Sequence, residues 1–513
     1  MGGRQFGLEC ATLDVAFDPA ADDRVDTIVA DGGVRVERRG AAGAMQAERL
    51  ELYLAANAKG DSVPRRLVAT RRIEARDDRQ TVWTEDLLVT FRERAEGGSA
   101  PAGEFGQIDV EKVETKGGVQ VRLAEGARVF ADGLSGDAVR RTLRLAGADI
   151  AIVRTNLMAD GLRGLELDEA GRSARSDGPG RLRTFRAPLA LGDGRIERPS
   201  PAGNESLEAS WSDAFSYAEA ADGRGTVDIR GDVKVRSRPA DNGSDAVDAK
   251  SIVLTVGPEA AAPRGDDADT ARALERFVAK GDARIESRLW PDASRSGDPR
   301  VFKVTGEHIE YDMRTREGAV PGAGTILVNV PAGGDAARAG AVGPGGDGTT
   351  RFRWKRGMAL ARQYDDVYRI AMDEEVEMLH AGLRADDTMS MRCDALEAIV
   401  RRPEVAAAAT TTAATTASAD ASGARGVDLG GPAELLGVRA SGGVFIRTPE
   451  QDIECGAFDY SVKTGIATLT AAEGRMVTVM VKGQPAPVRA AEVVWDMRSG
   501  RLQVTKASAN VGR

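Results

Sequence analysis

The chain has 513 residues, with 70 Lys and Arg against 79 Asp and Glu, which gives a formal net charge of −9. This length suffices for a sizeable core, and proteins of this length typically contain about two to four domains. The acidic balance disfavours a partner bound through phosphates, so no nucleic-acid partner is expected. Aromatic residues make up only 4% of the chain, too few to supply the aromatic girdles of a large outer-membrane barrel easily.

No apolar stretch of about 20 residues occurs, so no transmembrane helix is expected. Residues 1–14 lack a basic start followed by an apolar block, so no signal peptide is visible. The cysteines, Cys10, Cys393 and Cys455, are too few for a disulfide framework or a Cys-rich zinc site. Cys393 and Cys455 are predicted to be small core residues, with a disulfide between them as the alternative.

Short alternations of apolar and polar residues, ended by Gly, Asp, Asn or Ser, run through most of the chain and predict many β-strands. Residues 25–54 show the pattern first. Two alternating stretches flank Gly32–Gly33, and Leu50, Leu52 and Leu54 then share one face of a further strand. This order predicts an antiparallel meander, and the chain as a whole is predicted to be all-β.

Gly-based dipeptides recur between alternating stretches and are typical of tight hairpin turns. Each is therefore predicted to join two short strands. They are Gly32–Gly33, Gly117–Gly118, Gly231–Asp232, Gly281–Asp282 and Gly442–Gly443.

A second repeated unit places a small residue three positions before an apolar one, with another apolar residue two further on. Because the copies are irregularly spaced, they favour hairpin modules with variable insertions over a regular β-helix. The copies begin at Ala47, Gly147, Ala249, Gly306, Cys393, Cys455 and Ala490.

Composition suggests where the modules begin and end. A flexible Ala/Thr/Ser/Gly linker is predicted at 401–432, because that stretch has almost no large apolar residue. The predicted β modules are 1–105, 106–200, 201–256, 257–400 with a Gly-rich loop at 333–348, and 433–513.

Residues suited to catalysis are scarce. The two histidines, His308 and His380, are both predicted to lie on the surface of strands. Neither has a metal-ligating neighbour at a useful spacing in the sequence. A glycosidase needs two converging carboxylates, and 79 acidic residues offer no way to choose a pair. No catalytic residue, metal or cofactor is therefore expected, and the chain is predicted not to be an enzyme.

One segment alternates basic and aromatic residues. On a strand, Phe352 and Trp354 would share one face and Arg351, Arg353 and Lys355 the other. The functional interpretation is a cationic rim beside an apolar interior, suited to an amphiphile with anionic head groups. The alternative is an ordinary two-faced strand.

These repeated units resemble the OstA-like domain of periplasmic lipopolysaccharide-transport proteins of the LptA and LptC type. The resemblance rests on a Gly-Gly-Val or Gly-Asp-Val strand followed by a strand with the small-apolar pattern. The best matches are 32–36 with 45–52, 117–121, 231–235 with 247–252, and 442–446 with 453–460.

The resemblance implies tandem twisted, open β-jellyroll modules of short antiparallel strands, which shield acyl chains and associate edge to edge with other envelope β-jellyroll proteins. It further implies a periplasmic or cell-envelope location and lipopolysaccharide, or a related amphiphile, as ligand. The residues that would face the groove are Leu50, Leu52, Ile252, Leu254, Ile309, Tyr311, Phe458, Tyr460, Val493 and Trp495.

The expected function is the non-enzymatic binding or conveyance of an amphipathic lipid across the cell envelope. The alternative is a structural or adhesive β-repeat protein that binds protein or glycan without a lipid groove. A polysaccharide-active β-helix enzyme is disfavoured by the irregular period. The first two differ in whether the interior is an open groove or a closed core.

Overall fold

The computed structural model describes residues 6–19, 24–38, 43–57, 60–93, 108–200, 205–239, 241–258, 274–331, 347–383, 387–401 and 434–505. These residues form 33 strands and no helix, which confirms the predicted all-β class. Within them there is consequently no helix that could cross a membrane. The predicted linker at 401–432 and loop at 333–348 fall outside the described residues, apart from Arg401, Asp347 and Gly348.

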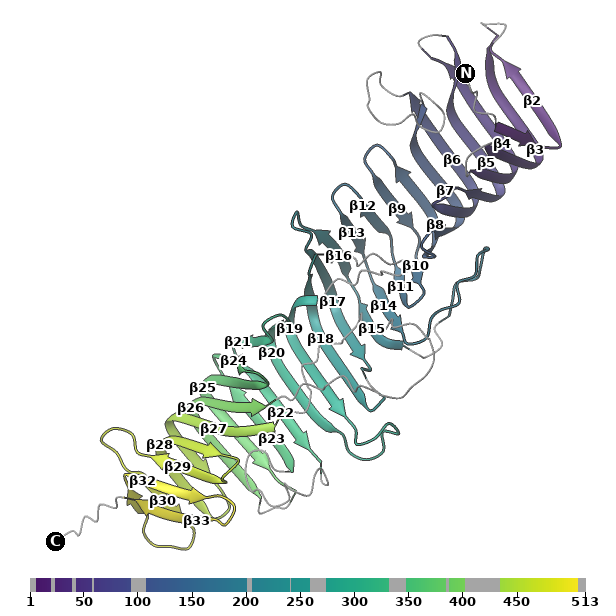
Figure 1. Cartoon of the computed structure of the whole chain (residues 1–513). Helices are drawn as coiled ribbons and strands as arrows, with labels where there is room; N and C mark the ends of the chain where they lie inside the picture. Colours follow the sequence, from purple (N-terminus) through teal and green to yellow (C-terminus); the bar gives the residue numbers. More distant parts are fainter. Residues whose placement is uncertain are drawn as a thin grey trace. The chain divides into compact units, whose positions relative to one another are not determined.

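The chain divides into two compact units, residues 1–221 with 225–231 and residues 222–224 with 232–513. We call them the N-terminal and the C-terminal unit. Consecutive long strands lie side by side within each unit (Figure 1).

The strands of the N-terminal unit are β1 (Phe6–Glu9), β2 (Thr12–Phe17), β3 (Val25–Arg38), β4 (Ala44–Ala56), β5 (Ser62–Arg76), β6 (Gln80–Glu93), β7 (Ile108–Leu123), β8 (Arg128–Asp137), β9 (Thr142–Ala146), β10 (Ile150–Arg154), β11 (Leu157–Leu162), β12 (Leu165–Asp168), β13 (Ser173–Asp177), β14 (Gly180–Phe185), β15 (Glu205–Trp211), β16 (Ala214–Glu219) and the first part of β17 (Gly225–Ser237).

The C-terminal unit continues from the rest of β17 with β18 (Gly243–Val256), β19 (Leu274–Leu289), β20 (Arg300–Asp312), β21 (Glu317–Pro321), β22 (Gly324–Val330), β23 (Gly348–Trp354), β24 (Gly357–Tyr364), β25 (Val367–Ala381), β26 (Thr388–Arg401), β27 (Glu434–Arg447), β28 (Gln451–Ser461), β29 (Ile466–Thr470), β30 (Val477–Val481), β31 (Val488–Ala490), β32 (Glu492–Asp496) and β33 (Arg501–Thr505).

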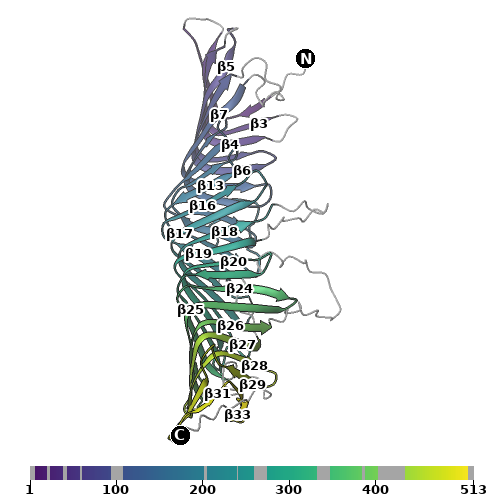
Figure 2. The same cartoon turned by 90° about the vertical axis from the view of Figure 1, so that its left-hand side faces the viewer.

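The Gly-based dipeptides do not form the predicted hairpin turns. Each lies in the middle of one long strand, as Gly32–Gly33 does in β3. Residues on both sides of this dipeptide continue to pair with β4, where Asp31 faces Arg49 and Val34 faces Ala47. The two residues therefore form a bulge that bends the strand without reversing it. Figure 2 shows the long strands of each unit from the side.

Such a bend occurs in seven long strands of the described residues, each with two successive residues at positive φ. Two of the seven, in β5 and β25, contain no glycine. The bends are Gly32–Gly33, Arg71–Arg72, Gly117–Gly118, Gly231–Asp232, Gly281–Asp282, Glu374–Glu375 and Gly442–Gly443.

The bends also explain the small-apolar repeat. Ala47, Cys393 and Cys455 each lie opposite the first residue after a bend in the neighbouring strand. Opposite a bend, the neighbouring strand has one residue fewer than the bent strand. Its inward-facing positions are therefore three residues apart there and two apart elsewhere. At these copies the motif marks the inner face of a strand opposite a bend, whereas the copy at Gly147 begins between β9 and β10 and that at Ala490 runs from β31 into β32. We define the inner face as the side that carries Ala47, Cys393 and Cys455 and the outer face as the opposite side.

Candidate functional site: the inner face of the N-terminal unit

An apolar row crosses the inner face of the N-terminal unit on six successive strands. Each member lies directly opposite the next in the strand register, and all are apolar. We call this the first row, and it consists of Val15, Ile28, Leu52, Leu67, Val89 and Val113.

A second apolar row lies on the other side of the bends. Its members are again in direct register, from β3 to β8. This second row consists of Val36, Met45, Ala75, Val82, Val121 and Val129.

The residues between the two rows are buried, whereas most of the rows themselves are only half-buried. At the bend, Ala30, Ala69 and Ile73 are at most 2% exposed. Leu52 and Leu67 are half-buried, and Val15 is 41% exposed. The inner face is thus packed at the bend and accessible along both rows. Half-exposed aliphatic side chains in continuous register form an extended apolar surface, of the kind that marks an interaction site.

The first row ends at a strand edge. β2 pairs with β3 along one side, and no strand of the described residues pairs with its other side. Leu13, Val15 and Phe17 alternate along β2 and are 50%, 41% and 56% exposed. The apolar inner face is therefore most exposed at this edge, where unpaired backbone groups are also available.

Of the residues predicted to face a groove, Leu50 and Leu52 belong to this surface. Leu52 is a member of the first row, and Leu50 is buried next to it at the bend. The remaining eight predicted residues lie in the C-terminal unit, where the inner face differs in character.

In the C-terminal unit these residues are packed core. Leu254 is half-buried, and the other seven are between 1% and 6% exposed. Tyr460 stacks with Phe458 at a ring-centroid distance of 6.3 Å. Tyr311, Tyr460 and Trp495 belong to one row across the strands. Gly318, Leu360 and Ile370 of the same row are half-buried, so the aromatic side chains close this face at their own positions only. Phe458 and Val493 lie in the adjacent row, while Ile252 and Ile309 face each other across Ala279.

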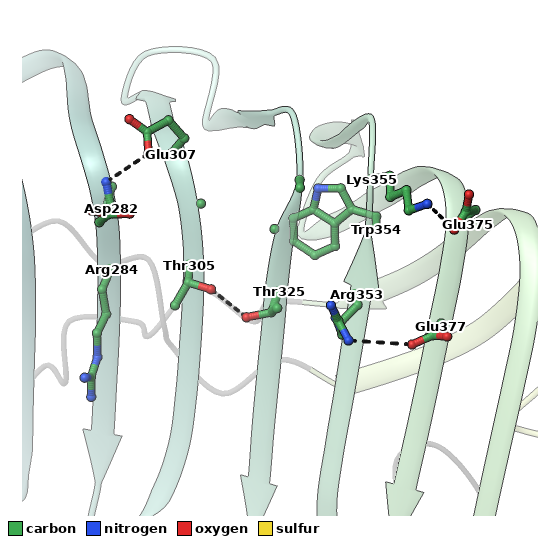
Figure 3. Close-up of a pocket in the computed structure, with 14 residues that line it drawn as sticks. Asp282, Arg284, Thr305, Glu307, Thr325, Arg353, Trp354, Lys355, Glu375 and Glu377 are labelled. Atoms are coloured by element: carbon green, nitrogen blue, oxygen red, sulfur yellow. Dashed lines mark hydrogen bonds and ion pairs between the residues drawn. The ribbon is translucent and has the colours of Figure 1, made fainter.

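The predicted cationic rim lies on the outer face of β23. Phe352 and Trp354 are buried on the inner side, whereas Arg351, Arg353 and Lys355 are exposed. Arg353 and Lys355 line an open hollow of about 780 Å³ (Figure 3).

Carboxylates pair with the cations of this hollow. Arg353 Nη1 lies 3.9 Å from Glu377 Oε2, and Lys355 forms an ion pair with Glu375 (Figure 3). Gly324 and Trp354 also line the hollow. The indole N–H of Trp354 donates to the Gly322 carbonyl at 3.0 Å. Four carboxylates and three cations line the hollow, so it does not form a rim of net positive charge beside the apolar interior.

The prediction that both histidines are surface residues is wrong for His380. Its side chain is 2% exposed, and Nδ1 lies 2.9 Å from the Thr350 hydroxyl. The reason is register: His380 is two residues from Met378 on β25 and shares its inner face. The His308 side chain is 33% exposed. The thiols of Cys393 and Cys455 are free and buried, and burial raises the pKa of each to about 12.

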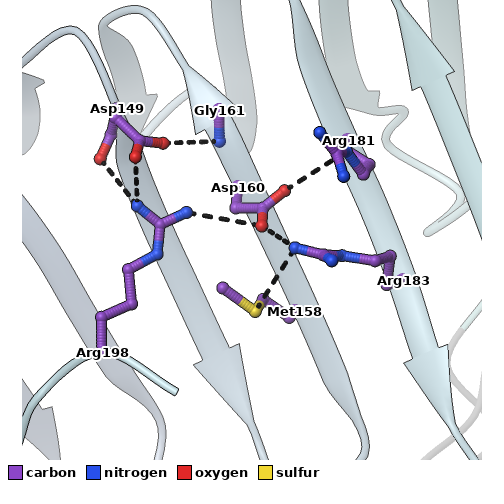
Figure 4. A network of polar contacts seen from close by, with 7 residues as sticks. All are labelled: Asp149, Met158, Asp160, Gly161, Arg181, Arg183 and Arg198. Atoms are coloured by element: carbon purple, nitrogen blue, oxygen red, sulfur yellow. Dashed lines mark hydrogen bonds and ion pairs between the residues drawn. The ribbon is translucent and has the colours of Figure 1, made fainter. Parts of the chain in front are cut away.

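An ion-pair network holds an irregular segment, 186–199, on the outer face of the N-terminal unit (Figure 4). Asp160 and Arg183 are buried and pair with each other. Arg198 of the segment reaches Asp149 Oδ2 at 2.6 Å and Asp160 Oδ2 at 3.4 Å.

The same segment is also held near its middle. Arg128, which is fully buried, donates to the Leu191 and Gly192 carbonyls. Leu189 and Leu191 pack against a buried cluster that contains Val153 and Met158. These contacts tie the segment to the strands beneath it, so we interpret the network as a structural device.

Most of the half-exposed rows escaped prediction from the sequence. Leu67, Val89 and Val113 each stand in alternating stretches, but their strands carry only loose copies of the repeat or none. The available signal was the alternation itself, which gives the face of a residue but not its neighbours across the sheet. The register between strands was needed to join them into rows.

Comparison with known protein families finds no family model that matches this chain, and comparison with curated proteins finds no significant match.

Proposed function

We propose that this chain is a non-enzymatic protein of the OstA-like type that binds or conveys an amphipathic lipid, such as lipopolysaccharide, in the cell envelope. The observation that carries the proposal is the pair of half-exposed apolar rows on the inner face of the N-terminal unit. Acyl chains would lie along these rows, and the packed residues at the bend would form the floor.

The energetics support an acyl ligand. Burying one methylene contributes about 0.8 kcal/mol, so the contact of long acyl chains with the rows supplies a large share of the binding free energy. The rows present aliphatic side chains with no charge among them, which suits a hydrocarbon better than a sugar or a peptide.

The edge of β2 supports the expected partners. Leu13, Val15 and Phe17 would be covered by a strand edge of another envelope β-jellyroll protein, which would also satisfy the unpaired backbone groups. Lipid could then pass along a continuous apolar surface. The location implied by this proposal is the periplasmic side of the envelope.

The test compares two neighbouring residues on β5 that are both half-buried but face opposite sides. Leu67→Gln introduces an amide into the first row, and Val68→Gln introduces the same amide on the outer face. We expect Leu67→Gln to weaken lipopolysaccharide binding roughly 5- to 30-fold, because desolvating an amide costs about 1–2 kcal/mol. Val68→Gln should bind as the unmodified chain does.

Binding is measured by native mass spectrometry of the gently purified protein, followed by lipid extraction and a lipopolysaccharide titration. Circular dichroism checks that both variants fold. A protein that carries no lipid and ignores lipopolysaccharide contradicts the proposal, as does an equal loss in both variants. The packed interior of the C-terminal unit would then favour the alternative, a β-repeat scaffold that binds protein or glycan partners.

A further inference from the structure

Five of the twelve methionines fall between positions 358 and 391, in the C-terminal unit. Three of them, Met378, Met389 and Met391, lie with His380 on the inner face of β25 and β26, and all four are 1–2% exposed. His380 is the one histidine among the described residues that is fully buried. The C-terminal interior therefore contains a compact group of thioether and imidazole side chains.

The strand register brings these four side chains together. His380 lies directly opposite Met389, and Met378 lies directly opposite Met391. Directly opposite residues have Cβ atoms about 4.5–5.5 Å apart, and diagonal neighbours are about 7–8 Å apart. Long, flexible methionine side chains can therefore place their sulfurs around a common point near the imidazole.

His380 is oriented for coordination. Its Nδ1 lies 2.9 Å from the hydroxyl of Thr350 on β23, which is 7% exposed. In the tautomer in which Nδ1–H donates to Thr350, Nε2 presents its lone pair to the methionines. A hydrogen bond from the second ring nitrogen is the usual support of a metal-binding histidine.

We propose that His380, Met378, Met389 and Met391 form a binding site for a soft monovalent metal ion, copper(I). Thioether sulfur is a soft ligand that selects copper(I) over hard cations, and imidazole also suits copper. None of the four side chains is a carboxylate, although Asp387 is near enough to act on the charge of His380, and thioether ligands make magnesium or calcium poor occupants. The site lies one residue from the end of β25, close to the surface loop that contains Leu383, 59% exposed.

The site is independent of the lipid-binding proposal, which concerns the N-terminal unit. The competing interpretation is that the methionines only fill space. Packing methionines would not respond to a soft metal, whereas ligands would, and the experiment is built on this difference.

The experiment uses the full chain with methyl-¹³C methionine, titrated with silver(I), a redox-inert substitute for copper(I). Because thiols also bind silver, Cys10, Cys393 and Cys455 are first changed to Ala, the residue that occupies the repeat position at Ala47, Ala249 and Ala490. We expect the methyl signals of Met378, Met389 and Met391 to shift at one equivalent. Met158 and Met372, which are equally buried, should not respond.

Copper(I) affinity is then measured in competition with a chromophoric chelator. His380→Gln keeps a hydrogen-bonding partner for Thr350 and should weaken binding at least 10-fold. Met372→Leu is the matched control on β25 and should leave binding unchanged. The proposal is overturned if no methyl of the three shifts, if Met158 and Met372 shift equally, or if binding disappears with the cysteines. The silver titration needs no His380 variant, so a variant that fails to fold does not decide the outcome.

Discussion

At the residue scale, the bends impose different demands on their two positions. A Cβ at Gly442 would lie 2.6 Å from Cβ of Asp394, whereas a Cβ at Gly443 would have nothing within 4 Å. Both residues have positive φ. In this bend, Gly442 therefore excludes a side chain by contact as well as by conformation, and Gly443 only by conformation. Asp occupies the second position at Asp232 and Asp282, which fits this difference.

Gly442→Ala should consequently destabilise the protein more than Gly443→Ala. The conformational penalty alone is about 1–2 kcal/mol for each, and the contact with Asp394 adds to it only at position 442. Urea unfolding of the two variants, monitored by circular dichroism, measures the difference. Equal urea midpoints would show that Asp394 moves aside without lowering the stability of the protein.

His380 gives the fold a pH dependence. Burial lowers its pKa in the folded state, so folding is favoured by the neutral ring above the unfolded value of about 6.5. This contribution is lost as the pH falls from about 6.5 through the folded pKa, by up to about 1.4 kcal/mol per pH unit. His380→Gln should therefore reduce the drop in the urea midpoint between pH 7 and pH 5. An identical drop in both proteins would mean that His380 is solvated.

At the element scale, a strand pair of this fold is one long, bent ribbon. Alternation along β3 and β4 predicted correctly which side chains share a face, including Leu50 and Leu52. It could not distinguish a hairpin turn at Gly32–Gly33 from a bulge, because both need two successive residues at positive φ. Only the pairing of both flanks with β4 decides between them.

The segment 186–199 shows how an element without regular structure is held. Asp160→Ala would leave Arg183 buried without its partner and would remove one contact of Arg198. Breaking a buried pair in this way costs about 3–5 kcal/mol. We expect the Asp160→Ala variant to be cleaved faster within 186–199. Limited proteolysis followed by mass spectrometry of the fragments measures this rate.

Glu166→Ala is the matched control, because its partner Arg144 is exposed at the surface. The interpretation fails if the two variants are cleaved at the same rate.

At the scale of the whole molecule, the two units share their strand architecture and differ in how their inner faces are filled. Aliphatic side chains such as Leu67 and Val89 are half-buried on the N-terminal inner face, whereas the aromatic side chains of Tyr311 and Trp495 are buried on the C-terminal one. The lipid-binding proposal therefore assigns different roles to the units, although their sequence repeats are alike.

Saturating lipid should accordingly slow hydrogen exchange in β4–β7 and leave β18–β20 unchanged. A ligand at 100 times its Kd stabilises the state that binds it by about 2.7 kcal/mol, and local exchange reports where this occurs. Exchange mass spectrometry of the full chain, with and without lipopolysaccharide, makes the comparison. Protection confined to β18–β20 would place the lipid in the C-terminal unit and contradict the proposal.

The sequence by itself determined the all-β class, the shared face of residues such as Leu50 and Leu52, and five of the seven positions with two successive residues at positive φ, because alternation and positive φ are local properties. Tertiary structure alone decided that Gly32–Gly33 bends rather than turns, that His380 is buried, and that Leu52, Leu67 and Val89 join in one row. These features depend on which residue lies opposite which across strands. Whether an inner face is open or packed depends on the volumes that meet there, and the volumes become neighbours only once the register is set.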